Sequence, residues 1–385
     1  MKAVNPVIGF FLGDATCAVA PESALWNAAL PTDRTSGPGD TGDVSVGDYF
    51  LAAERFFRDD DFQTVRNAAA CLLKTPVLSE DIRDIGVCLV KHGRFYHPSK
   101  VSVRLHDGRS MSLALNMAFS PEGNDTVSRE CAALNMLQDR VDGVPAVFGK
   151  KSGERLFGRI HSAFCVPWFE GFHEFHLTTD PEGNQRTVLW DTDLGNRYLS
   201  EDEVFSLYHG VARILTDSYN LFTCEQIQPW HHAAGDFVFG TANGTPEVRL
   251  ITVRQYTSLF QACPETPGEL AEAALIFLAG LAIRTRLDRA DGLGEILWAR
   301  STAVQATIQG FFESLAVKAG KSGDAETLVL VIQAMAGQLD EADLFDYSQM
   351  IIDSYNPLSP EVAIVRQNLK AHAEECFRAL RAMDF

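Results

Sequence analysis

The spacing of apolar residues changes along the chain and divides it into three parts. Residues 31–46 are rich in Gly, Pro, Asp and Thr, the composition of a loop. Residues 48–57 and 60–73 then carry apolar side chains at helical spacing. Residues 1–84 are therefore predicted to form a helical leader with a flexible loop, which packs on the part that follows.

From residue 85 the apolar period shortens to that of strands. Strands are predicted over residues 87–90, 100–105 and 112–118, with a hairpin turn at residues 106–109. One helix follows over residues 124–140, and further strands are predicted at 144–148, 155–160 and 163–167. Residues 85–167 are thus predicted to form a small β-rich lobe with one helix.

The rest of the chain, residues 168–385, has mainly helical spacing. A hairpin is predicted over residues 176–189, and Ser200 with Glu203 forms a capping box that opens a helix to about residue 219. A strand at residues 247–253 precedes helices at 267–287, 294–318, 324–339 and 360–383. This part is predicted to be a mainly helical lobe.

Composition narrows the class of partner. With 46% hydrophobic and 22% charged residues the chain is globular, and its net charge of -18 argues against nucleic acid and against anionic membranes. No apolar run reaches the length of a membrane helix, and an N-terminal run that faintly imitates a signal peptide is broken by Pro6 and Asp14. Eight cysteines without a CxxC pair fit reduced thiols in a cytoplasmic protein. We therefore expect a small molecule or a protein as the partner.

A polar cluster lies between a predicted helix and a predicted strand in the last part. Residues 228–239 read QPWHHAAGDFVF, and the strand at residues 247–253 follows shortly after. Together with the order of elements, this cluster resembles the protein-kinase-like fold, nearest the aminoglycoside phosphotransferase and choline kinase branch. The resemblance implies an α+β, two-lobed protein with a small antiparallel-sheet N-lobe holding one helix and a large helical C-lobe. It also implies a cleft between the lobes and ATP with Mg²⁺ as cofactors.

Three residues of the predicted N-lobe and Trp168, directly after it, correspond to nucleotide-binding positions of this family. Asn116 stands where the resemblance places a lysine that grips the phosphates, and Glu130 is similar to the glutamate that holds this lysine. Val166 and Trp168 lie in a segment that looks like the hinge, whose backbone would bind adenine. Glu130 has a second interpretation as a solvated surface residue, and the hinge segment as a buried strand end.

The loop itself can be matched to the family in two registers. In the preferred one, Asp236 is a metal ligand and His231 stands where the base aspartate belongs. In the other, Asp236 is the base, at the family's spacing from His232, and Thr241 replaces an asparagine. His231, His232 and Asp236 are therefore the candidate catalytic residues, although the default interpretation of the two histidines is a place in the interior.

Thr252 stands where the family has its second metal-binding aspartate, and a neutral hydroxyl is a poor sole ligand for Mg²⁺. Three charged groups of the family are thus replaced. The sequence favours a kinase-like protein with degraded catalytic residues that binds a small ligand, a nucleotide or a protein partner in the cleft. Two alternatives stay open: an active ATP-dependent phosphotransferase on a small hydroxyl-bearing substrate, and a non-catalytic helical interaction protein.

A separate metal site is a further hypothesis. His173 and His176 are three positions apart, which suits chelation on a helix, and Asp191 or Asp193 could complete the ligand set.

Overall fold

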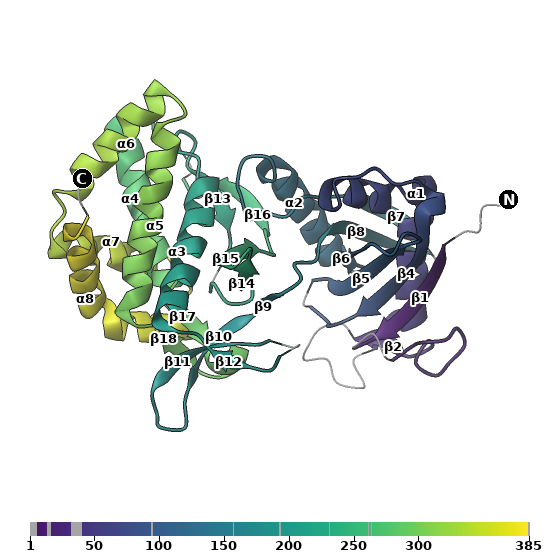
Figure 1. The fold of residues 1–385 in the computed structure, drawn as a ribbon. Coiled ribbons are helices and arrows are strands. Elements are labelled where there is room, and N and C mark those ends of the chain that lie inside the picture. Colours follow the sequence, from purple (N-terminus) through teal and green to yellow (C-terminus); the bar gives the residue numbers. More distant parts are fainter. Residues whose placement is uncertain are drawn as a thin grey trace. The chain divides into compact units, whose positions relative to one another are not determined.

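The computed structural model describes residues 6–13, 17–31, 41–93, 95–156, 158–191, 194–230, 232–260, 262 and 264–383 (Figure 1). Its contacts divide the chain into two compact units. Unit 1 comprises Met1–Asp139 and Pro145–Glu170, and unit 2 comprises Arg140–Val144 and Gly171–Phe385. Both units mix helices with sheet, so the fold is α+β.

Unit 1 is built on a six-stranded sheet in the order β1-β4-β5-β6-β8-β7. Strand β1 runs parallel to β4, whereas the other neighbours are antiparallel, so the sheet is mixed rather than antiparallel as predicted. The elements of unit 1 are β1 (Val7–Leu12), β2 (Ala29–Pro31), β3 (Thr41–Ser45), α1 (Val46–Leu72), η1 (Ser79–Asp81), β4 (Ile82–Leu89), β5 (His97–Leu105), β6 (Ser110–Ala118), α2 (Pro121–Leu137), β7 (Gly149–Leu156) and β8 (Arg159–Pro167).

Helix α1 is part of the core of unit 1, because it shares one buried cluster with the sheet. Tyr49 is fully buried and its hydroxyl bonds the carbonyl of His97 at 3.0 Å and the hydroxyl of Ser99 at 2.7 Å. The leader also contributes β1 to the sheet, which its apolar run had not indicated. A kink at residues 59–62, where Asp60 has φ 51°, divides α1 in the way that two predicted helices would.

The sheet keeps one apolar side against α1. Along β5, Val101, Val103 and Leu105 are buried, whereas Ser102 and Arg104 between them are exposed, the alternation that a strand with one covered face requires. On β6 the residues that join this cluster are Leu113, Leu115 and Met117 among others. Ala118 points to the opposite side, where its Cβ lies against Gly123 of α2. The two helices therefore lie on opposite sides of the sheet.

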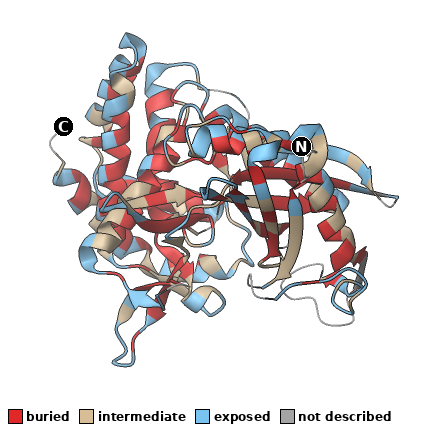
Figure 2. Cartoon of the chain, turned by 45° about the vertical axis from the view of Figure 1, so that its right-hand side comes forward, coloured by how far each residue is buried: buried red, intermediate tan, exposed pale blue. Residues whose placement is uncertain are grey.

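In the residues that the structure describes, unit 2 combines four small sheets with a group of long helices. Buried residues follow the inward sides of these helices (Figure 2). Its elements are β9 (Phe172–His173), β10 (Phe175–Thr179), β11 (Gln185–Leu189), β12 (Arg197–Tyr198), α3 (Glu201–Ser218), β13 (Glu225–Gln228), β14 (Phe237–Ala242), β15 (Thr245–Leu250), β16 (Gln255–Ser258), α4 (Pro267–Arg284), β17 (Leu287–Arg289), η2 (Ala290–Gly292), β18 (Ile296–Trp298), α5 (Ser301–Ala319), α6 (Gly323–Ala336), α7 (Glu341–Asp353) and α8 (Pro360–Arg381).

Helices α3 and α5 cross closely. A Cβ built on Gly310 would lie 2.6 Å from the carbonyl oxygen of His209, so only glycine permits this approach. Lys318 Nζ donates to the carbonyls of Asp217 and Tyr219, both at 2.9 Å, and so satisfies the C-terminal end of α3. Among the described helices, none combines the length and the apolar character that crossing a bilayer requires.

Four predicted elements differ from the structure. Residues 144–148 form no strand, and the segment predicted at 155–160 spans the turn between β7 and β8. Strand β17 begins at the end of the helix predicted at 267–287, and strand β18 lies at the start of the helix predicted at 294–318. Helix α7 was not predicted. Its capping box, Asp340 with Asp343, is the signal that could have indicated it.

A buried charge cluster joins α8 to the β17–β18 hairpin. Arg286 is 4% exposed, pairs with Glu375, donates from Nε to the Ala299 carbonyl at 2.8 Å, and lies over the Trp298 ring. His372 is 1% exposed beside it, with Nδ1 3.4 Å from Nη1 of Arg286. Burial, together with the charge of Arg286, lowers the pKa of His372 to about 3.

We expect unit 2 to lose stability as the pH falls below about 6.5, the usual pKa of histidine in an unfolded chain. Between this value and the folded pKa of about 3, the unfolded state binds the extra proton at His372 and the folded state does not. Each pH unit in this window then lowers the free energy of unfolding by ~1.4 kcal/mol. Urea unfolding at pH 7 and pH 5 should show a loss about 2 kcal/mol larger in the wild type than in His372→Gln. An equal loss in both proteins would contradict the assignment.

Candidate functional site

The loop before β14 is held in place by backbone hydrogen bonds of unit 2. Strands β14 and β15 form a hairpin whose two turn residues, Asn243 and Gly244, have φ of 52° and 80°, as a type I′ turn requires. Asp236 directly precedes β14 and follows Gly235, which has φ 85°. The amide of Phe237 donates to the Ala233 carbonyl at 3.1 Å, so the loop closes on itself before the strand begins.

Asp236 forms an ion pair with Arg254, in which each carboxylate oxygen lies near one terminal nitrogen of the guanidinium. Nη1 of Arg254 lies 3.0 Å from Oδ2 of Asp236, and Nη2 lies 3.0 Å from Oδ1. The Asp236 side chain is 5% exposed and that of Arg254 is 32% exposed. Nη1 also donates to the Pro229 carbonyl at 3.1 Å. The contact between Nη1 and Oδ2 is a charge-assisted hydrogen bond, and Nη2 lies within ion-pair distance of Oδ1.

The segment after β15 lies alongside this loop. The amide of Ile251 donates to the carbonyl of Asp236 at 2.9 Å, which brings residues 251–254 next to the carboxylate. Thr252 is half-buried in this segment, two residues before Arg254. Thr252 thus lies in the segment next to Asp236, and Arg254 of the same segment, which the sequence had not singled out, contacts the Asp236 carboxylate. The available signal was an arginine directly after the strand predicted at residues 247–253, because an aspartate that becomes buried needs a counter-charge.

His232, in the same loop, faces Glu361 at the start of α8. His232 Nε2 lies 3.5 Å from Oε1 of Glu361, and both side chains are largely buried, at 15% and 13% exposed. Burial alone would raise the pKa of Glu361, but the Ser359 hydroxyl, its own backbone amide and the charge of His232 hold this pKa below its usual range. If His232 acts as the general base of the second register, it does so next to the Glu361 carboxylate. His231 lies outside the described residues.

Trp230 lies in the interior, at 3% exposed. The guanidinium of Arg284 lies 5.7 Å from the centre of its ring, and Nε of Arg284 is 3.3 Å from the Tyr355 hydroxyl. The loop that carries the candidate residues is therefore anchored at one end by an aromatic side chain and at the other by the Asp236–Arg254 pair.

The structure places Asn116 and Glu130 on the same side of the sheet in unit 1. Asn116 is 6% exposed and shares a face of β6 with Ala118, the face that α2 covers. Glu130 of α2 is fully buried, so its interpretation as a solvated surface residue is wrong. A buried carboxylate requires compensating polar contacts, and Asn116 can offer an amide but no charge.

Val166 and Trp168 lie at the end of β8. Val166 is buried and pairs with Ala114 of β6 in the sheet. The amide of Trp168 donates to the Ser112 carbonyl at 3.0 Å, and Nζ of Lys100 lies 5.3 Å from the centre of its ring. These contacts extend the sheet by one residue beyond β8, so both residues belong to unit 1.

The metal hypothesis for His173 and His176 does not match the structure. The two residues lie on strands β9 and β10 rather than on a helix. His173 Nε2 is 3.6 Å from Asp191, whereas His176 Nδ1 is 3.3 Å from Asp288, so each histidine faces a different carboxylate. Asp193 lies outside the described residues. In the part of the chain that the structure describes, no three His, Cys, Asp or Glu side chains gather as a metal site would require.

Comparisons with known proteins show little likeness in sequence. No protein-family model matches the chain, and no curated protein matches it. Among solved structures, it is similar to the apoenzyme of macrolide 2'-phosphotransferase MphH from Brachybacterium faecium, with a TM-score of 0.31 and 11% identity. The match covers 85% of this chain and 99% of that one.

We expect Arg254→Met to lower the free energy of unfolding by about 2 kcal/mol, because it takes the guanidinium away from a buried carboxylate. The double variant Asp236→Asn/Arg254→Met removes the buried charge as well and should be more stable than Arg254→Met alone. Urea unfolding of the wild type, both single variants and the double variant gives the coupling energy. Losses that simply add would contradict a direct pair.

Proposed function

We propose that this chain is a kinase-like protein whose catalytic residues are degraded and which acts by binding a ligand rather than by metal-dependent phosphoryl transfer. The observation that carries the proposal is the ion pair between Asp236 and Arg254. In the preferred register Asp236 is the metal ligand of the resemblance, yet both its oxygens face a guanidinium. The arginine thus supplies the positive charge that Mg²⁺ would otherwise supply.

Replacing this guanidinium by Mg²⁺ would be costly. Mg²⁺ demands a near-octahedral set of oxygen ligands and gives up its water reluctantly. Thr252, the neighbouring residue in the resemblance, offers a neutral hydroxyl instead of a second carboxylate. To bind at this place, Mg²⁺ would therefore have to displace the Arg254 guanidinium from the largely buried Asp236 carboxylate. Asp236 would then be its one charged ligand.

The residues of unit 1 support the same proposal. The resemblance places a lysine at Asn116, held by the glutamate at Glu130, to grip the phosphates. An amide at this place carries no charge for a phosphate group, and Glu130 is fully buried. Val166 and Trp168 would still allow a nucleotide base to bind through the backbone, so ATP without a metal is one ligand within the proposal.

The proposed partner is a small ligand, a nucleotide or a protein, and the proposed location is the cytoplasm. The net charge of -18 supports the exclusion of nucleic acid and of anionic membranes. An active phosphotransferase, with Asp236 as metal ligand and His232 as base, is the alternative that the following experiment separates.

We expect the wild type to show no stabilisation by Mg²⁺ or Mn²⁺, with or without ATP, and no ATP turnover. Thermal unfolding reports such binding, since a ligand of the native state raises the midpoint by mass action. Arg254→Ala should gain stabilisation by Mg²⁺, because it removes the guanidinium that faces the Asp236 carboxylate. Arg366→Ala, which removes an exposed arginine paired with Asp353, is the matched control and should gain none.

Magnesium-dependent ATP turnover that is lost in Asp236→Ala would establish the active phosphotransferase instead. Failure of Arg254→Ala to gain any response to Mg²⁺ or Mn²⁺ would show that the arginine is not what keeps the metal out.

A further inference from the structure

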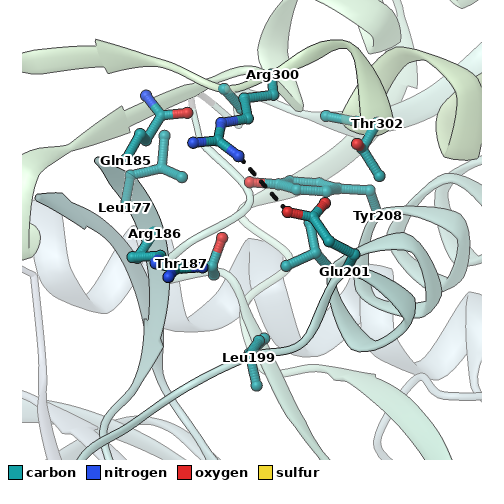
Figure 3. A pocket seen from close by; sticks show the side chains of 12 residues that line it. Leu177, Gln185, Arg186, Thr187, Leu199, Glu201, Tyr208, Arg300 and Thr302 are labelled. Carbon is teal, nitrogen blue, oxygen red and sulfur yellow. Dashed lines mark ion pairs between the residues drawn. The ribbon is translucent and has the colours of Figure 1, made fainter. Parts of the chain in front are cut away.

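A hollow in unit 2 lies away from the loop of Asp236. It is enclosed by the β10–β11 hairpin, by α3 and by the start of α5, and it comprises about 400 Å³ including the part open to solvent (Figure 3). Its apolar lining residues include Leu177, Val204 and Ala303. Its polar lining residues include Tyr208, Glu201, Arg300 and Thr302.

Tyr208 is the feature of this hollow that points to a ligand. The residue is 3% exposed, and its hydroxyl points into the hollow, towards Leu177 and Gln185 (Figure 3). Among the described residues, no group lies in hydrogen-bond contact with this hydroxyl; the fully buried Tyr49, in contrast, bonds Ser99. Burial and the charge of Asp288 raise the pKa of Tyr208, so the phenol stays neutral and can donate. A donor on a largely buried side chain that faces a hollow favours an acceptor in that hollow.

The start of α5 supplies a positive end to the same hollow. The first turn of this 19-residue helix contributes Thr302 and Ala303 to the lining, and its N-cap, Arg300, makes no side-chain capping bond. Helix α3 beside it is capped by Ser200. Free amides and the helix dipole at such an end favour an anion.

Arg300 is held only weakly by the protein itself. Nη1 of Arg300 lies 3.5 Å from Oε1 of Glu201, and the two side chains are 53% and 68% exposed. An exposed pair at this distance contributes little. A carboxylate of the protein thus stands beside the arginine at the mouth of the hollow, where a carboxylate from solution could take its place.

We propose that this hollow binds a small carboxylate with a short aliphatic body. The carboxylate accepts hydrogen bonds from the Tyr208 hydroxyl and from Arg300 near the start of α5. The aliphatic body lies against Leu177, Val204 and Ala303. Glu201 competes with the ligand for Arg300. The proposal does not depend on the proposed function, because all these residues are separate from the loop of Asp236.

The experiment measures binding of butyrate to the full chain by calorimetry, with butyramide as the neutral ligand of the same shape and inorganic phosphate as an anion without an aliphatic body. We expect saturable binding of butyrate and at least tenfold weaker binding of the other two. Tyr208→Phe keeps the ring and should weaken butyrate about tenfold. Arg300→Gln should weaken it at least as much, whereas Glu201→Gln should tighten it several-fold.

Circular dichroism at the start of each titration checks that every variant is folded. Butyramide binding as tightly as butyrate, or phosphate binding in preference to it, would overturn the proposal. Equal butyrate affinity in the wild type, Tyr208→Phe and Arg300→Gln would overturn it too. Because Glu201→Gln is expected to gain affinity, the proposal can be tested even where the other two variants lose stability.

Discussion

A carboxylate that is withdrawn from water needs a counter-charge nearby, and the candidate site of unit 2 is organised around this need. Asp236 is 5% exposed, and Arg254 reaches it from the segment after β15 with both terminal nitrogens. The same arginine donates to the Pro229 carbonyl, so one side chain connects three points of the loop and the following segment.

The same rule shapes the rest of unit 2. Arg286 is almost fully buried and is compensated by Glu375, by the Ala299 carbonyl and by the face of Trp298. These contacts connect α8 to the β17–β18 hairpin. His372 beside this arginine stays neutral, since a second positive charge in the same interior would be costly. Arg286 and Asp236 are thus both compensated by charged partners from other segments of unit 2.

Tyr208 differs from these groups, because no described residue forms a hydrogen bond with its hydroxyl. Tyr49 is equally buried, but its hydroxyl bonds two groups of β5 and fastens α1 to the sheet. The Tyr208 hydroxyl faces an open space that also receives the start of α5. A tyrosine hydroxyl that bonds within the core at Tyr49 is thus directed towards a hollow at Tyr208, which supports a ligand there.

The sequence by itself determined the elements whose signals are local. Helical spacing and a Ser200–Glu203 capping box located α3, and alternation located β5 and β6, because periodicity and caps act over a few residues. It also placed Asp236 and Thr252 as candidates. It missed β1, whose pairing with β4 joins residues about 75 positions apart, a contact that no local pattern contains. Only the tertiary structure decided that Arg254 neutralises Asp236, that Glu130 is buried and that Tyr208 faces a hollow. Each of these depends on which distant side chains meet, and that is settled by packing rather than by spacing along the chain.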